Sequence, residues 1–241
     1  ARIPLAQKIP IDERRVTPQA LDALATRAAA ALDSLAPGAH AESPALGPLQ
    51  RRLVPSFEAV IARLGDRARF APPRVKPTIF ALFFGLSGTS GFTDPWTHEI
   101  NLDPGATAVE RPALYAHEWG HLSGFADETE ANYISVLACT RSHDPLLEYS
   151  GWLLVWFNLP QSAHPARALS PLADADVGEI VRRYLARRNP LIERIQRLAY
   201  GAYLQRNGVA TGYASYSLFV RWLLGARYDR GGLPLTARLN E

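Results

Sequence analysis

One helix-length segment, bounded by Pro112 and Gly124, constrains this chain more than any other stretch. Proline suits the first turn of a helix because its missing N–H would be unpaired there anyway, and glycine commonly supplies the left-handed residue that ends a helix. Only Gly120 lies between them as a weak helix former, at a cost of roughly 1 kcal/mol relative to alanine. We therefore predict a helix from Pro112 to about Ser123, and we expect Gly120 to admit the close approach of a neighbouring element.

The predicted helix carries the pentapeptide His-Glu-Trp-Gly-His at residues 117–121. Residues four apart share one face of a helix, so His117 and His121 can offer two imidazoles to one ion. Glu118 lies at the edge of that face, where its carboxylate can reach a water on the ion without binding the ion itself. This H-E-x-x-H pattern predicts a zinc peptidase site with two histidine ligands, a third protein ligand and Glu118 as general base.

Three acids at the start of a second predicted helix, residues 127–140, compete for the place of the third ligand. Asp127 stands at an N-cap position and Glu130 has the spacing of a capping box, so both have a structural role. Glu128 has none, and we favour it as the third zinc ligand, with Glu130 and Asp127 as open alternatives. The spacing of His121 and Asp127 also resembles the metzincin pattern, but those enzymes need a methionine-containing turn and this chain has no Met.

A resemblance to a known family rests on five short sequence motifs between residues 91 and 151. They are GFTDPWTHEIN from Gly91, HEWGH from His117, GF from Gly124, ETEANY from Glu128 and YSG from Tyr149. The segment resembles a bacterial family of predicted membrane-anchored zinc metallopeptidases, grouped as a domain of unknown function. Its Glu-x-x-Ala-Asn word is also similar to the Glu-x-x-Ala-Asp word of gluzincin peptidases, whose first Glu binds zinc. The resemblance implies Glu128 as a ligand and places Asn132 where gluzincins have Asp.

Localisation follows from this resemblance more than from composition. Family members usually carry transmembrane helices ahead of this region, which implies a membrane-associated bacterial protein with a soluble catalytic domain and an anchor outside the given sequence. No apolar run here reaches the roughly 18 residues that a membrane span needs. The net charge of +3 is too mild to indicate nucleic acid, and we expect none as a partner. The single cysteine, Cys139, excludes an internal disulfide and is expected to be a small buried residue.

The chain is expected to form one domain, residues 1–241, with an N-terminal helical part (1–73), a part holding the sheet and the zinc site (74–142) and a C-terminal helical part (143–241). Residues 1–16 are predicted as an extended arm and 37–48 as a proline-rich loop. An aromatic-rich helix should follow Asp144-Pro145. The other expected elements are helices at 17–35, 49–64, 176–188, 191–206 and 215–225, a short strand or helix at 78–84 and a half-buried strand at 98–102.

Three further features bear on the site. We predict that strand 98–102 is an edge strand that holds an extended substrate, with His98 near the cleft. Tyr216, and less favourably Tyr149, could stabilise the oxyanion that forms during hydrolysis. An arginine-rich pair of helices is more simply a solvated face than a surface for anions; its members are Arg182, Arg183, Arg187, Arg188, Arg194 and Arg197.

The sequence thus predicts an α+β, predominantly α-helical, zincin-like domain with a small antiparallel sheet. The expected function is zinc-dependent hydrolysis of peptide bonds in a peptide or protein substrate, with one Zn²⁺ per chain held by His117, His121 and Glu128. Glu118 and Tyr216 are the expected catalytic residues. Two alternatives stay open, namely a zincin-like binding or sensor domain that cleaves nothing, and a protein that binds anionic surfaces through the arginine-rich helices.

Overall fold

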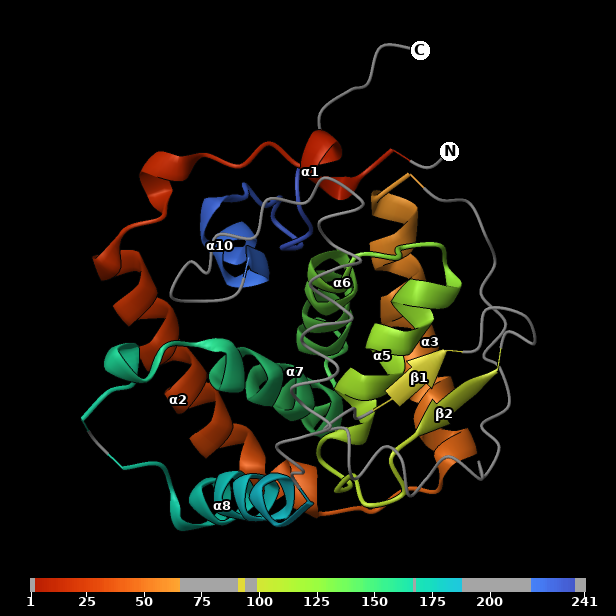
Figure 1. Cartoon of the computed structure of the whole chain (residues 1–241), viewed down its shortest axis with the longest axis vertical. Helices are drawn as coiled ribbons and strands as arrows, with labels where there is room; N and C mark the ends of the chain where they lie inside the picture. Colours follow the sequence, from red (N-terminus) through yellow and green to blue (C-terminus); the bar gives the residue numbers. More distant parts are fainter. Residues whose placement is uncertain (1–2, 66–90, 94–98, 167, 188–217, 237–241) are drawn as a thin grey trace.

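The computed structural model describes residues 3–65, 91–93, 99–166, 168–187 and 218–236 (Figure 1). In these ranges the protein is predominantly α-helical, which confirms that part of the predicted fold class. The helices are α1 (Leu5–Lys8), α2 (Pro18–His40), α3 (Leu46–Arg63), α5 (Arg111–Leu122), α6 (Glu128–Thr140), α7 (Pro145–Asn158), α8 (Pro171–Arg187) and α10 (Leu218–Gly225). Short 3-10 turns occupy Glu13–Arg15 and Gln161–Ala163.

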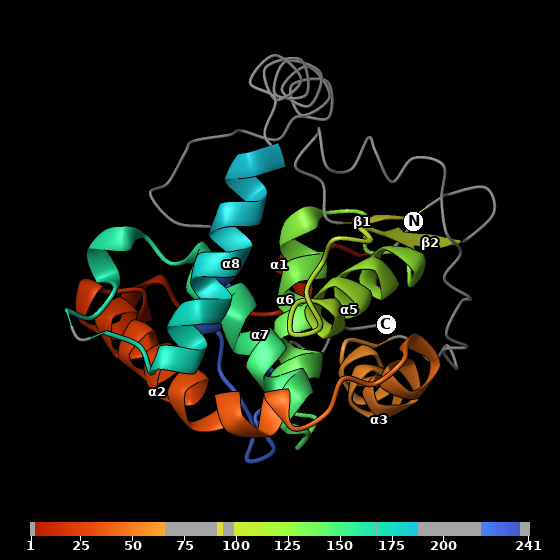
Figure 2. The same cartoon turned by 90° about the horizontal axis from the view of Figure 1, so that it is seen from below.

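A small antiparallel sheet consists of β1 (Gly91–Thr93) and β2 (Ile100–Leu102), with Phe92 opposite Asn101. Strand β2 begins at Ile100 and is shorter than the strand predicted at 98–102, because Glu99 is described but lies outside the strand. Both strands contact α5, which carries the H-E-x-x-H sequence, and Figure 2 shows the sheet beside that helix. The sheet therefore covers one side of the helix on which the predicted site depends.

Helix starts follow the predicted caps. The side chain of Thr17 accepts a hydrogen bond from the backbone N of Ala20 at 3.1 Å, and Asp144 accepts one from Leu146 N at 3.0 Å. Asp127 accepts hydrogen bonds from the backbone N of Thr129 and of Glu130 at the start of α6. Each of these side chains satisfies an N–H that has no partner inside its helix, so local sequence fixes where α2, α6 and α7 begin.

Two predictions for the N-terminal part were wrong. Residues 1–16 are no simple extended arm, because α1 and a 3-10 turn lie in this segment, and both Leu5 and Ile9 are buried. The proline-rich loop at 37–48 is shorter than expected, because α2 continues through Pro37 to His40 and α3 begins at Leu46. In both places burial of apolar side chains, including Ala36 and Ala39 of α2, outweighs a weak local preference.

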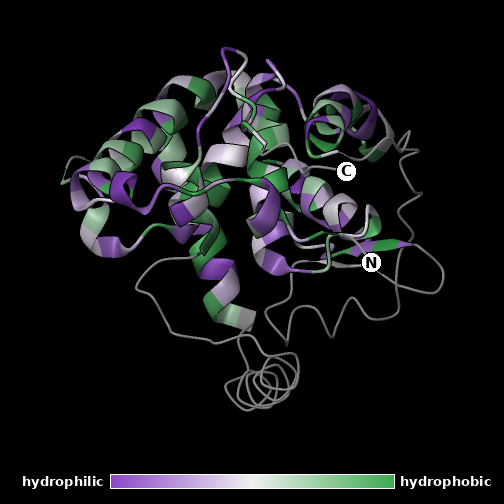
Figure 3. Ribbon diagram, turned by 90° about the horizontal axis from the view of Figure 1, so that it is seen from above, coloured by the Kyte–Doolittle hydropathy of each residue, from purple (hydrophilic) through white to green (hydrophobic). Residues whose placement is uncertain are grey.

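The core lies where α2, α3, α5, α6 and α7 pack together. Aromatic residues fill its centre, and Trp119 of α5 meets Phe57 of α3 edge-to-face with ring centroids 5.3 Å apart. Cys139 is fully buried in α6, as predicted. Figure 3 shows hydrophilic and hydrophobic residues alternating around several helices, as expected where each helix buries one face. No helix among the described residues is long and apolar enough to span a bilayer.

Several predictions fall outside the described residues. These are the element at 78–84, the helix at 191–206, and the positions His98, Tyr216, Arg188, Arg194 and Arg197. The last predicted helix, 215–225, is represented by α10, and the helix predicted at 176–188 begins earlier, at Pro171.

Candidate metal centre

The end of α5 is built as the sequence predicts and places a backbone acceptor beside His121. Gly124 has a φ of 86°, the left-handed conformation that ends a helix at low cost in glycine. Phe125 N then donates to Gly120 O at 3.1 Å and Gly124 N donates to His121 O at 2.9 Å, which is the Schellman pattern. The turn brings the carbonyl of Phe125 to 2.8 Å from Nδ1 of His121.

Helix α6 returns close against α5 because Gly120 has no side chain. A Cβ at Gly120 would lie 3.3 Å from Cα of Ala131 in α6, which is tighter than most real contacts. The predicted close approach of a neighbouring element is therefore confirmed. This close packing of the two helices places Glu128, in the first turn of α6, beside the His117 imidazole of α5.

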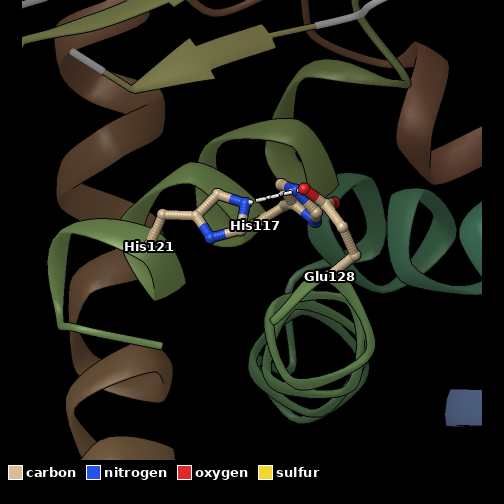
Figure 4. Close-up of side chains that lie close together, drawn as sticks. All are labelled: His117, His121 and Glu128. Atoms are coloured by element: carbon tan, nitrogen blue, oxygen red, sulfur yellow. Dashed lines mark hydrogen bonds and ion pairs between the residues drawn. The ribbon is translucent and has the colours of Figure 1, made fainter. Parts of the chain in front are cut away.

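Three side chains converge at this point (Figure 4). Nε2 of His117 lies 3.0 Å from Nε2 of His121, and the Glu128 carboxylate oxygens lie 3.2 Å from the first nitrogen and 3.5 Å from the second. In a tetrahedral site with bonds of 2.0–2.1 Å to zinc, neighbouring ligand atoms are about 3.3 Å apart. The spacing of the three donor atoms therefore fits one zinc ion with a fourth position left for solvent.

The hydrogen bonds of the two imidazoles also favour a cation between them. Nδ1 of His121 faces the carbonyl of Phe125, so it carries the proton, and Nδ1 of His117 faces Oδ1 of Asn132 at 2.9 Å in the same way. Each neutral ring then presents the lone pair of Nε2 to the other ring and to the carboxylate. Converging lone pairs repel unless a proton or a metal ion lies between them, and a partner at Nδ1 is the usual support of a metal-binding histidine.

The Glu128 carboxylate brings a negative charge to the centre. The hydrogen bonds to His117 and His121 hold the pKa of the Glu128 carboxyl well below its usual range, so it is ionised at neutral pH. Burial lowers the pKa of His121, but its hydrogen bonds to Glu128 and to Phe125 outweigh burial and raise it overall. The Glu128 side chain is 56% exposed, so the centre opens to solvent on this side.

Glu118 lies on the other side of the centre, buried under the sheet. It is only 4% exposed, and burial raises the pKa of its carboxyl, against the charges of the nearby histidines, which lower it. Oγ1 of Thr93 donates to Oε2 of Glu118 at 2.6 Å. A Cβ at Gly91 would lie 2.5 Å from Oε1 of Glu118, so only glycine leaves room for this carboxylate.

The structure separates the three acids considered as the third ligand. Asp127 caps α6, as predicted. Oε1 of the buried Glu130 accepts a hydrogen bond from Leu5 N at 2.6 Å, which is a tertiary contact. Of the three, only Glu128 belongs to the cluster with His117 and His121.

The alternative oxyanion donor Tyr149 lies elsewhere, because its hydroxyl donates to Oδ2 of Asp176 at 2.5 Å, on α8. Tyr216 lies outside the described residues. Sequence reasoning missed the roles of Thr93, Gly91 and the Phe125 carbonyl. Thr93 and Gly91 belong to the GFTDPWTHEIN motif that contributes to the family resemblance. Their role became visible only from the contact with Glu118.

Fold and site together describe a predominantly helical protein whose H-E-x-x-H helix faces the Glu128 carboxylate of the next helix. The model of one family, described as "Protein of unknown function (DUF3810)", matches residues 1–224, and the chain belongs to that family. No curated protein and no solved structure matches the chain.

Proposed function

We propose that the protein is a zinc-dependent metallopeptidase that hydrolyses peptide bonds with Glu118 as general base. The observation that carries the proposal is the convergence of His117, His121 and Glu128 next to a buried carboxylate that does not belong to the donor set. One open coordination position beside an acid is the arrangement that metal-assisted hydrolysis requires. The family resemblance of the 91–152 segment supports the same function.

Zinc held by His117, His121 and Glu128 would polarise the scissile carbonyl and lower the pKa of the attacking water to about 7. Glu118 would accept the proton of that water and pass it to the leaving amine. Its Oε2 is held by Thr93, whereas Oε1 has no hydrogen bond to a described residue and is the oxygen available for the proton. A raised pKa suits this role, because a general base works best with a pKa near the working pH.

The sheet beside α5 suggests how a peptide would bind. An extended substrate can add to a strand through backbone hydrogen bonds, and β2 is the strand that we propose for this contact. Tyr216 remains our proposed donor to the oxyanion. Association with a bacterial membrane, through an anchor outside the given sequence, is likewise proposed from the resemblance alone.

The test is cleavage of an unbiased peptide library by the zinc-loaded protein and by Glu118→Gln. Wild-type protein should bind about one zinc per chain and cleave, whereas Glu118→Gln should retain zinc and lose at least about 100-fold in kcat/KM, the contribution typical of general base catalysis. Glu148→Gln, at a half-buried acid of α7, is the matched control and should cleave as wild type does.

The outcomes separate the peptidase from the alternatives. Bound zinc without any cleavage would reject the peptidase and favour a zincin-like binding domain. Absence of zinc, together with salt-dependent binding to anionic vesicles that ignores Glu118→Gln, would favour the surface-binding alternative.

A further inference from the structure

A second concentration of charge lies at the opposite end of α6, where Arg141 follows the last turn. Its side chain lines a cavity of about 310 Å³ between α2, α6, α7, α10 and the segment 228–232. Arg27 and Trp152 line the same cavity, as does Tyr228. Two arginines from distant parts of the sequence therefore meet at one hollow, away from the metal centre.

The charge of Arg141 is only partly balanced there, because the carboxylate of Asp229 acts on it without forming an ion pair with it. Its Nε is buried and has no hydrogen-bond partner, and its guanidinium lies 5.7 Å from the ring centroid of Tyr228. A Cβ at Gly232, which has a left-handed φ of 72°, would collide with this guanidinium, so Arg141 lies directly against the chain at that position. With the described residues Arg141 forms no ion pair, and leaving a buried charged donor unsatisfied is costly. An acceptor from outside the chain would remove that cost.

Arg27 adds a second unpaired cation. Its guanidinium lies 5.2 Å from the ring centroid of Trp152, and it too forms no ion pair with a described residue. Burial lowers the pKa of Arg141 and the nearby charge of Arg27 adds to this, whereas Tyr228, Tyr133 and Asp229 act in the opposite direction. Glu148 also lines the cavity but pairs with neither arginine among the described contacts; the charges that act on it are those of His143 and Asp144. The two guanidiniums thus repel each other across the cavity.

We infer that this cavity binds a small phosphomonoester, with the phosphate between Arg27 and Arg141 and the organic part against the apolar wall formed by Leu24, Val155 and Leu223. Two guanidiniums that form no ion pair with a described residue, Glu148 of the same cavity included, can hold a phosphate dianion, and the planar fork of each guanidinium matches phosphate oxygens. The volume falls in the range of small-molecule sites. This inference does not depend on the proposed peptidase activity.

The experiment titrates phenyl phosphate and inorganic phosphate into the full chain at low ionic strength and follows the heat of binding. Phenyl phosphate should saturate one site and bind more tightly than inorganic phosphate, because the apolar wall adds a contact. Arg27→Gln should weaken phenyl phosphate by about tenfold or more, the usual effect of removing one charged hydrogen-bond partner. Arg27 is exposed, so its replacement should not disturb folding. Arg141→Lys, which keeps the charge but loses the fork, should also bind more weakly.

The matched control is Arg182→Gln, the same change at an exposed arginine of α8, and it should bind as wild type does. A second control is His117→Ala, because phosphate could otherwise bind a metal at the centre; binding should survive this change. Loss of binding in His117→Ala, equal weakening in Arg182→Gln and Arg27→Gln, or no saturation by 10 mM (about 3 kcal/mol of binding free energy) would each overturn the inference.

One further arm identifies the source of the phosphate. Vesicles of phosphatidylcholine with and without phosphatidic acid, whose headgroup is a phosphomonoester, are sedimented with wild-type protein and with Arg27→Gln. Sedimentation that needs both phosphatidic acid and Arg27 would assign the site to a lipid headgroup. Saturable binding of phenyl phosphate without sedimentation would assign it to a free phosphomonoester.

Discussion

Titratable side chains cluster near both ends of α5, and the two clusters differ in their contacts. Just before the helix, Glu110 accepts hydrogen bonds from Arg183 at 2.5 and 2.7 Å and from Thr107. Near the other end, Nε2 of His117 and Nε2 of His121 lie close to each other and to the Glu128 carboxylate. The first cluster is complete and ties α8 to α5, so it is structural. For the second cluster we propose a bound cation, and the exposed Glu128 side chain distinguishes this candidate site from a buried salt bridge.

The largest effect expected from this difference is stabilisation by zinc. Zinc at about 1,000 times its dissociation constant should raise the free energy of unfolding by about 4 kcal/mol. Glu128→Gln should remove most of this gain yet leave the metal-free protein close to wild type, because the side chain is 56% exposed. Denaturant unfolding with and without zinc measures both quantities. Equal stabilisation of wild type and variant would show that Glu128 is not a ligand.

The Glu110–Arg183 pair before α5 should contribute to the free energy of unfolding independently of zinc. Arg183→Gln should lower the free energy of unfolding by about 3 kcal/mol with or without zinc, because it leaves the largely buried Glu110 without its charged partner. Arg182→Gln, at the next residue, should change it by less than about 0.5 kcal/mol because that side chain is 74% exposed. If the two variants unfold alike, the Glu110–Arg183 pair is not the structural tie that its geometry indicates.

The close packing that unites the centre is tested by Gly120→Val. The added side chain must push α6 away from α5, which should cost about 2 kcal/mol and weaken zinc binding as Glu128 moves from the histidines. Gly178→Val is the matched control, because a Cβ there meets nothing within 4 Å and valine is no worse than glycine in a helix. Unchanged zinc affinity in Gly120→Val would mean that the centre does not depend on this approach.

The smallest expected effect concerns the support of His117. Asn132→Ala should weaken zinc binding by about tenfold, or roughly 1.4 kcal/mol, because His117 loses the partner of its Nδ1. Competition with a chromogenic chelator measures the affinity. Asn132→Asp should bind zinc at least as tightly as wild type, and Asn158→Ala, in α7, should have no effect. A tighter site in Asn132→Ala would contradict the proposed support.

Much of the site could be predicted because its determinants are local. The spacing of His117 and His121, the cap at Asp127 and the turn at Gly124 each depend on residues within a few positions of one another. The predicted boundaries failed at Pro37 and in residues 1–16, where burial against distant helices overrides local preference.

The sequence by itself determined that two imidazoles share one helix face and that an acid-rich helix follows at once. Only the tertiary structure decided that Glu128 reaches them while Glu130 bonds to Leu5, because that choice depends on how closely α6 approaches α5 at Gly120. The tertiary structure likewise decided that Thr93 contacts Glu118 and that Arg27 lines the same cavity as Arg141. Residues far apart in the chain meet only through packing, and packing is a property of the whole fold, which no local pattern encodes.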